Sequence, residues 1–236
     1  MNSQSTDMSD IPDTAEAVVQ AITSRRSVRG FLPRHVDAQL LRRILAIAAA
    51  APSGSNIQPW KVHVATGSMR DELSAALHAA HESGVATARE YEYYPMAWRS
   101  PYIERRRACG WGLYGALGIK KGEREATARQ HGRNYLFFDA PVVLIFTIDN
   151  DLQKGSWLDY GMFLENIMVA ARGFGLHTCP QAALANYPDI VKRLLGIDAK
   201  QTLVCGMAIG YEDPTCAANQ FRTTRIDLDE FVTFHE

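Results

Sequence analysis

APSGSNIQPW, residues 51–60, lies where the chain changes from a helical pattern to a strand pattern. Before it, Leu41, Ile44 and Ala48 recur at helical spacing, with Asp37 placed to cap that helix and Pro52 to end it. After it, WKVHVAT, residues 60–66, alternates apolar and polar side chains as a half-buried strand does. The hydroxyls and carboxamides between the two patterns either bond to one another or hold a polar, planar ligand edge, and the residues alone leave both interpretations open.

Further out, the same reasoning predicts alternating helices and a few strands. We expect helices over residues 13–24, from Gly67 through Leu77, over residues 157–173 and from Pro188. VVLIFTI, residues 142–148, is the continuous apolar run of a strand covered on both faces, and LVCGMAI, residues 203–209, is another core strand, broken by Gly206. Few strands separated by helices favour an α+β fold over a doubly wound parallel sheet.

Length and composition set broad limits. With 236 residues, of which 47% are hydrophobic, the chain can bury one large core, so we expect a single domain over residues 13–236 after a disordered lead-in over residues 1–12. A formal net charge of −1 gives no general attraction to nucleic acid or to an anionic membrane. The four cysteines form no CxxC pair, and neither a signal peptide nor an apolar run of about 20 residues is present. We therefore expect a cytoplasmic protein.

Three further segments are candidate ligand sites. RRSVR, residues 25–29, combines the guanidinium groups of Arg25, Arg26 and Arg29 with the Ser27 hydroxyl, which suits a phosphate; alternatively, it is a basic helix end that complements the helix dipole. HTCPQAALA, residues 177–185, offers backbone and small side chains to a flat ring, or is a packed crossover. In the tail, FRTTR, residues 221–225, supplies two more arginines for an anion, or a solvated basic face.

The middle of the chain, residues 84–134, is an excursion rich in aromatic residues. These rings either stack on an aromatic ligand or pack at a subunit interface. The excursion contains GWGLYG, residues 110–115, which matches a dinucleotide-binding fingerprint in letters only, because it follows RRRAC rather than a strand. His78 and His81 lack further ligands, so we predict no metal site.

Taken together, RRSVR, PSGSNIQPW, CPQAA and GYEDP in this order resemble the nitroreductase family, and the resemblance covers residues 15–235. PSGSN, the long excursion and CPQAALA resemble most the branch of the family that reduces nitrobenzoates and related nitroaromatic compounds. It implies an α+β fold whose central, mixed but mainly antiparallel sheet is flanked by helices. It also implies an intertwined homodimer with two FMN sites at the interface, and a tail over residues 217–236 that docks on the partner subunit.

The resemblance implies a set of residues that bind tightly held FMN. Those near its phosphate, ribityl chain and pyrimidine side are Arg25, Arg26, Ser27 and Arg29, with Arg222 and Arg225 from the tail. Those reaching the partner's FMN are Pro52, Ser53, Gly54, Asn56 and Gln58, and those whose backbone faces flavin N5 are Pro180, Gln181, Ala182 and Ala183. Many members carry a glutamate in this last segment, and here no carboxylate is present. No residue is assigned as a catalytic acid or base.

The implied activity is reduction of nitroaromatic compounds to hydroxylamines or amines, with NADPH or NADH as reductant and ping-pong hydride transfer through flavin N5. The protein would supply position and electrostatics to chemistry that belongs to the cofactor. Two alternatives stay open. One is a quinone or enone reductase or a reductive dehalogenase on the same fold, and the other is a flavin-binding sensor or storage protein without turnover. Neither nucleic acid nor membrane is expected as a partner.

Overall fold

An antiparallel sheet of four strands forms the centre of the structure, a computed structural model that describes residues 13–235. The strands lie in the order β1-β2-β4-β3, so each pair of neighbours runs antiparallel. Their bounds are β1 Lys61–Thr66, β2 Val142–Asp149, β3 His177–Gln181 and β4 Gln201–Gly210. The predicted α+β class is confirmed, and the lead-in over residues 1–12 lies outside the described residues.

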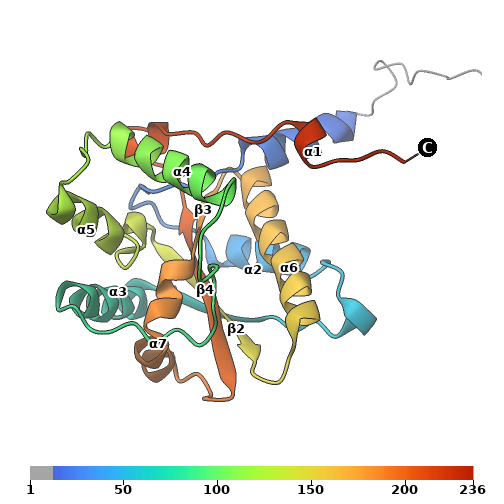
Figure 1. The fold of residues 1–236 in the computed structure, drawn as a ribbon. Helices are drawn as coiled ribbons and strands as arrows, with labels where there is room; N and C mark the ends of the chain where they lie inside the picture. The colour runs from blue at the N-terminus through green and yellow to red at the C-terminus, as the bar shows by residue number, and fades with distance from the viewer. Residues whose placement is uncertain (1–12, 236) are drawn as a thin grey trace, which may run out of the picture.

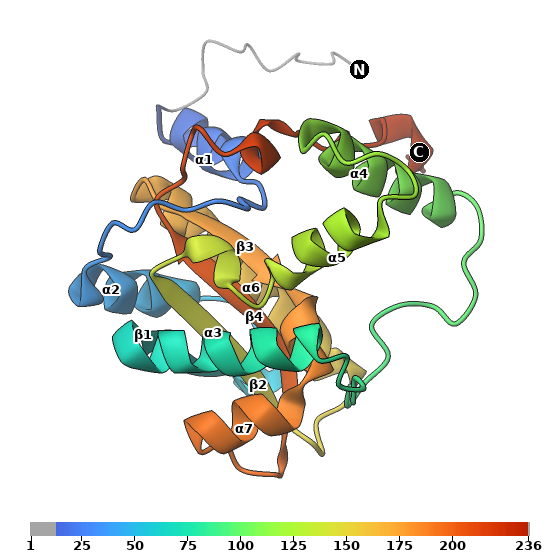
Figure 2. The same ribbon diagram turned by 90° about the vertical axis from the view of Figure 1, so that its left-hand side faces the viewer.

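Seven α-helices surround this sheet in the described part of the chain. They are α1 Asp13–Ser24, α2 Ala38–Ala48, α3 Gly67–Glu82, α4 Tyr102–Ala116, α5 Arg124–Gly132, α6 Lys154–Gly173 and α7 Pro188–Leu195. Short 3-10 helices complete it: η2 Gly54–Asn56, η3 Phe137–Asp139, η4 Ala182–Asn186, η5 Ala217–Gln220 and η6 Leu228–Glu230. α6 stands along one side of the sheet in Figure 1, and α3 and α7 lie across the other side in Figure 2.

β2 is buried on both faces, as its continuous apolar run predicts. Val143 and Ile145 belong to the core on the side of α3 and α7, whereas Leu144 and Phe146 belong to the core beneath α2 and α6. Side chains of a strand alternate between its two faces, so one strand contributes to both cores. This double cover leaves the ends and the β3 edge of the sheet for a site.

The helix α2, residues 38–48, has both the cap and the buried apolar face that its sequence predicts. The Asp37 carboxylate accepts hydrogen bonds from the backbone N–H groups of Gln39 and Leu40, 2.8 and 3.0 Å long. It therefore satisfies donors that the first turn of the helix would leave unpaired, which is the predicted cap. Leu41, Ile44 and Ala48 are buried along one face of the helix.

Gly206 was predicted to break the last core strand, and this was wrong, since β4 is continuous from Gln201 to Gly210. A Cβ atom at Gly206 would lie 2.3 Å from Cδ2 of Leu184. The glycine is required for close packing of η4 on the strand rather than for a break. The irregularity of this strand lies beside it, where the pairing register shifts opposite Phe146 and Thr147.

β3 is the strand that the sequence did not predict. Residues 177–181 were considered either a ligand-facing loop or a packed crossover, yet they pair antiparallel with β4 from His177 to Gln181. The strand has only five residues and includes Pro180, so neither alternation nor apolar run is visible in it. Because it is the edge strand, the missing N–H of the proline is tolerated.

α1, α4 and the C-terminal segment all lie at the same end of the molecule, at the top of Figures 1 and 2. Phe221 packs so closely on α4 that a Cβ atom at Gly112 would come within 2.2 Å of its ring. Beyond Phe221 the segment holds exposed apolar side chains, Phe231 at 63% and Phe234 at 76%. Among the helices of residues 13–235, none has the length and apolar character needed to cross a bilayer.

Candidate functional site

RRSVR leaves α1 and runs alongside the free edge of β3. Ser27 forms a parallel bridge with Thr178, and the N–H of Val28 donates to the Thr178 carbonyl over 3.0 Å. Val28 is fully buried, whereas its neighbours Ser27 and Arg29 are only partly buried. The alternation of an extended segment therefore fixes the arginines and the serine beside the end of the sheet.

Asn219 joins the C-terminal segment to this extended stretch. Its Oδ1 accepts from the Arg29 N–H at 2.7 Å, and its Nδ2 donates to the carbonyls of Gly30 and Asp213 at 2.8 and 2.9 Å. The side chain is 2% exposed, so these bonds satisfy a buried amide. Arg222 donates to the Asn219 carbonyl, which brings a tail arginine to the same place.

RRSVR and the tail enclose a cleft of about 700 Å³. Among the described residues, six arginines line it together with one carboxylate, that of Glu165; the arginines are Arg25, Arg26, Arg29, Arg172, Arg222 and Arg225. Ser27 and Thr223 add hydroxyls to the lining. The structure thus brings together, in one cleft, all six residues expected from RRSVR and the tail. Such an excess of guanidinium groups is chemically suited to a phosphate dianion.

Two of these guanidinium groups are incompletely paired. Nε of Arg25 lies 3.3 Å from Oε1 of Glu165, but the angle is unsuitable for a hydrogen bond, and Nε of Arg26 is also buried without a hydrogen-bond partner within the described chain. Arg26 makes its ion pair through Nη2, with Glu212. Buried unpaired donors are costly, so the cleft retains unused capacity for an anion.

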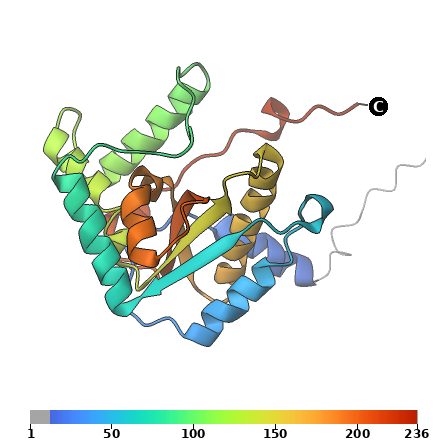
Figure 3. The ribbon, with the colours of Figure 1, turned by 90° about the horizontal axis from the view of Figure 1, so that it is seen from below.

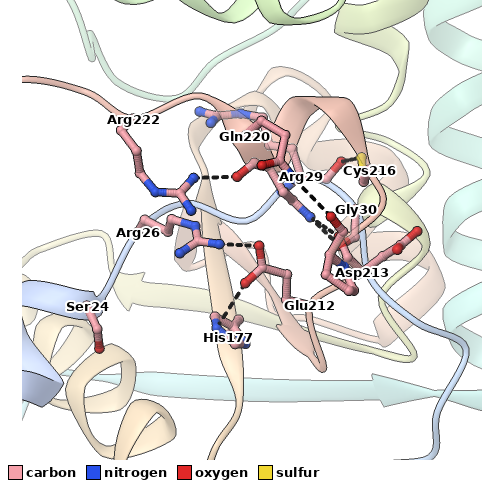
Figure 4. A network of polar contacts seen from close by, with 12 residues as sticks. Ser24, Arg26, Arg29, Gly30, His177, Glu212, Asp213, Cys216, Gln220 and Arg222 are labelled. Atoms are coloured by element: carbon pink, nitrogen blue, oxygen red, sulfur yellow. Dashed lines mark hydrogen bonds and ion pairs between the residues drawn. The ribbon is translucent and has the colours of Figure 1, made fainter.

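His177 contacts Glu212, as Figure 4 shows, and it also contacts Arg172 at the end of α6. Its Nε2 is 3.0 Å from Nη1 of Arg172 and 3.2 Å from Oε2 of Glu212. Burial, reinforced by the Arg172 charge, lowers the pKa of His177 to about 4. The imidazole is therefore neutral at pH 7, and Glu212 keeps its negative charge available for Arg26.

The end of β3 separates two further clefts. Pro180, Gln181 and Ala182 line both, one of about 490 Å³ and one of about 580 Å³. Nε2 of Gln181 donates to the Asn134 carbonyl at 2.7 Å, and its Oε1 is buried without a partner in the described chain. Gln181 is 2% exposed, so its side chain is a fixed part of the wall and only its neighbours present accessible surface.

Aromatic residues of the excursion form the outer walls of these two clefts. Tyr93 lines both, Tyr94 lines the smaller one, and Tyr91 with Trp157 lines the larger one. The rings of Tyr91 and Trp157 lie 4.7 Å apart, as do those of Tyr93 and Tyr94. The excursion thus places flat apolar surface over the backbone of residues 180–182, an arrangement that can accept a planar aromatic molecule.

Pro52 to Gln58 are not part of the arginine-lined cleft or of the two clefts beside Gln181. Their segment lies beside α6 (Figure 3). The Gly54 N–H donates to Oδ2 of Asp159 in α6 at 3.0 Å. The loop is partly self-satisfied, because the Gln58 N–H donates to Oγ of Ser53 at 3.0 Å. Ser55, Asn56 and Gln58 adopt positive φ angles, which hold their side chains on an exposed, pre-shaped surface.

Sequence reasoning missed several residues of this region. Arg172 reaches the cleft from the last turn of α6, where basic residues are common for dipole reasons and therefore carry no distinctive signal. Glu212 is in the quoted motif GYEDP but was assigned only to a turn. Asn219 carries no pattern of its own, and only the folded contact between tail and RRSVR reveals its role.

Comparisons with known proteins show which family this chain is similar to. The model of the nitroreductase family matches residues 22–211. A 4-nitrobenzoate reductase of Pseudomonas putida is 42% identical over 227 residues, which cover 96% of this chain and 98% of that protein. A chloronitrobenzene nitroreductase of Comamonas testosteroni is 38% identical, with 94% of this chain and 99% of that protein covered.

Two solved structures share the fold closely. The FMN and NADPH-dependent nitroreductase NfnB from Sphigopyxis sp. strain HMH has a TM-score of 0.90 and 36% identity, and the match covers 93% of this chain and 99% of that one. The FMN-dependent nitroreductase NfnB from Mycobacterium smegmatis, in complex with NADPH, has a TM-score of 0.91 and 33% identity, with 95% and 100% covered.

Proposed function

Because the chain belongs to the nitroreductase family, we propose that it is an FMN-dependent oxidoreductase that uses a reduced nicotinamide to reduce nitroaromatic compounds. The observation that carries this proposal is the cleft in which six arginines face one carboxylate. Its buried, unpaired Nε atoms on Arg25 and Arg26 fit a phosphate, which is the charged end of FMN.

We assign the groups around the phosphate from this geometry. Arg25, from the end of α1, and Arg222, from the tail, both line the cleft, and Ser27 lines it beside β3, to which its backbone is bridged. Glu212 holds Arg26 through an ion pair, and His177 contacts Glu212 in turn. Arg29 is fixed through its backbone by Asn219, and its guanidinium has a single weak bond, 3.3 Å to the Ser27 carbonyl, so it remains able to bind an anion.

We place the flavin ring against the end of β3. Pro180, Ala182 and Ala183 present small side chains and backbone there, so a flat ring can approach closely. Bound FMN supplies the redox chemistry, taking a hydride from NADPH or NADH and delivering electrons to the nitro group. A hydroxylamine product requires two such reductions and releases one water. The chain contributes position, charge and the exclusion of water by the tyrosine-lined walls.

NADPH is our first choice of reductant, because both NfnB neighbours are described with it. Sequence and fold contain no separate nucleotide-binding segment, so we place the nicotinamide on the same ring face that the acceptor later occupies. We also assign the protein to the cytoplasm, where reduced nicotinamides are supplied and four unpaired cysteines stay reduced. Cell fractionation tests this assignment.

We further propose a homodimer in which Pro52, Ser53, Gly54, Asn56 and Gln58 reach the FMN of the partner subunit. This is supported by apolar surface that the single chain leaves open, notably Val18 and Val19 on α1, exposed at 55% and 57%, besides the tail phenylalanines. Sedimentation equilibrium checks the proposal, and a monomer that retains full FMN occupancy would contradict it.

An anaerobic titration tests the proposed activity. The purified protein should show a bound flavin whose absorbance near 450 nm is bleached by NADPH and restored by 4-nitrobenzoate. An acceptor series of nitroarenes, quinones and haloarenes then compares the alternatives, and we expect nitroarenes to give the highest kcat/KM. A protein that is colourless, and stays so after addition of FMN, would refute the proposal. Bleaching without reoxidation by any acceptor would indicate a sensor or storage protein instead.

A further inference from the structure

The smaller cleft beside Gln181 contains a single permanent cation. Arg89 lines it, and the described residues around it include neither lysine nor carboxylate. Two histidines, His81 and His131, are present as well, and burial together with the neighbouring His81 lowers the pKa of His131. His131 is therefore neutral at pH 7, and no acid in the lining cancels the charge of Arg89.

Arg89 is held in place from one side only. Its Nε donates to Oδ1 of Asn186 at 2.5 Å, and Nδ2 of Asn186 donates in turn to the Tyr135 hydroxyl at 2.8 Å. The backbone is fixed at the same point, since the N–H of Ala88 donates to the Asn186 carbonyl at 2.9 Å. Within residues 13–235 neither Nη1 nor Nη2 of Arg89 makes a hydrogen bond or an ion pair, so the outer face of a pre-oriented guanidinium is unused.

The acidic neighbours of Arg89 in the sequence are directed elsewhere. Glu90 pairs with Lys192 and accepts from the Leu203 N–H at 2.8 Å. Glu92 lines the other cleft, on the far side of Tyr93. Glu90 is therefore committed to other groups, and neither carboxylate forms an ion pair with Arg89 within the described residues.

From this geometry we infer that Arg89 binds the carboxylate of the acceptor, so that the protein prefers nitroaromatic acids to uncharged nitroarenes. The inference rests on the proposed function, because the same cleft is bounded by Pro180, Ala182 and Ala183, where the flavin is placed. Tyr93 and Tyr94 line the same cleft and can stack on the benzene ring. A rigid ring held by a carboxylate at one end directs a para nitro group to the other end.

The test compares two acceptors of the same shape, 4-nitrobenzoate and 4-nitrobenzamide, on wild type and on Arg89→Gln. In equilibrium titrations of the oxidised, flavin-containing protein, wild type should bind the carboxylate more tightly. Arg89→Gln should raise the Kd of 4-nitrobenzoate by about tenfold to a hundredfold, the size expected for loss of a pair of charge-assisted hydrogen bonds. The Kd of 4-nitrobenzamide should stay within about twofold of the wild-type value. In steady-state assays the same ratio should appear in kcat/KM.

Two further variants and one separate rate complete the design. Arg89→Lys keeps the charge without the planar fork and should fall between wild type and Arg89→Gln. Arg193→Gln removes an exposed arginine of α7 and should leave the affinity for both acceptors unchanged. The rate of flavin bleaching by NADPH, measured without acceptor, should be unchanged in Arg89→Gln; if it falls instead, the arginine binds a nucleotide phosphate and the inference is wrong.

Equal losses for both acceptors, or no loss for either, would also overturn the inference. Because the titrations measure binding, they decide the role of Arg89 even if turnover is absent. Absence of turnover with every nitroarene would count against the proposed function alone.

Discussion

At the scale of residues, the candidate site is characterised by buried polar atoms that have no hydrogen-bond partner in the described chain. Nε of Arg25 and Arg26, Nδ1 of His177, Oγ1 of Thr178 and Oε1 of Gln181 are buried and have no hydrogen-bond partner among residues 13–235, and these residues lie on or beside RRSVR and β3. Sequence reasoning identified three of these five, Arg25, Arg26 and Gln181, because they fall in recognisable motifs. His177 and Thr178 were missed as site residues because an unpaired atom is a property of the folded packing.

His177 gives a prediction about pH. Its folded pKa, about 4, is below the value of about 6.5 for an unperturbed histidine, so between these two pH values the unfolded chain binds a proton that the folded chain does not. The free energy of unfolding should therefore rise with pH over this window, be fully recovered above about pH 6.5, and be lost as pH falls toward 4.

His177→Gln should remove that contribution, so that its unfolding free energy rises less steeply between pH 4 and 6.5, by the equivalent of up to about one proton. Urea unfolding at a series of pH values measures the slope, with His35→Gln, at an exposed position, as the control for loss of a histidine. Identical slopes for His177→Gln and wild type would show that the buried imidazole is not held neutral.

At the scale of elements, periodicity predicted what is long and regular. The bounds of α1 and α2 and the double burial of β2 follow from apolar spacing and a cap. β3 was not predicted, because a five-residue edge strand that contains a proline has no period to detect. The contact of the tail with α4 was also unpredictable, since it depends on one glycine, Gly112, facing one ring.

That contact yields the second prediction. A methyl group at position 112 would come within 2.2 Å of the Phe221 ring and force the ring, and with it the adjacent Arg222, to shift. Gly112→Ala should therefore weaken FMN binding several-fold, measured by fluorescence titration of the flavin.

Gly110→Ala is the matched control on the same helix, since nothing lies within 4 Å of its added Cβ. Both substitutions should favour the helix by about 1 kcal/mol, so the difference between them isolates the contact with Phe221. Equal FMN affinity in the two variants would contradict the prediction, because it would show that the contact between Gly112 and Phe221 does not position Arg222 for FMN binding.

At the scale of the whole molecule, the fold brings residues that are far apart in the sequence together in one cleft. Arg25, Arg172 and Arg222 come from the end of α1, the end of α6 and the tail. They line one cleft because RRSVR is bridged to β3 at Ser27 and Asn219 holds the tail against RRSVR. Composition could not predict this, since a net charge of −1 conceals a local excess of arginine. The motif resemblance assigns RRSVR and the tail arginines to one phosphate, and that assignment stays a prediction. The folded chain shows that these residues line one cleft and that Arg172, which the resemblance did not include, lines it too.

The most direct test of this account is the affinity of the flavin-free protein for FMN compared with riboflavin, which differs only in lacking the phosphate. With several charge-assisted hydrogen bonds available in the cleft, wild type should bind FMN at least about a hundredfold more tightly. In the double variant Arg25→Gln/Arg222→Gln, the ratio of FMN affinity to riboflavin affinity should fall markedly, while riboflavin affinity stays within about twofold of the wild-type value. Equal affinity of wild type for FMN and riboflavin, or an unchanged ratio in the double variant, would contradict the assignment of the arginine-lined cleft to the phosphate.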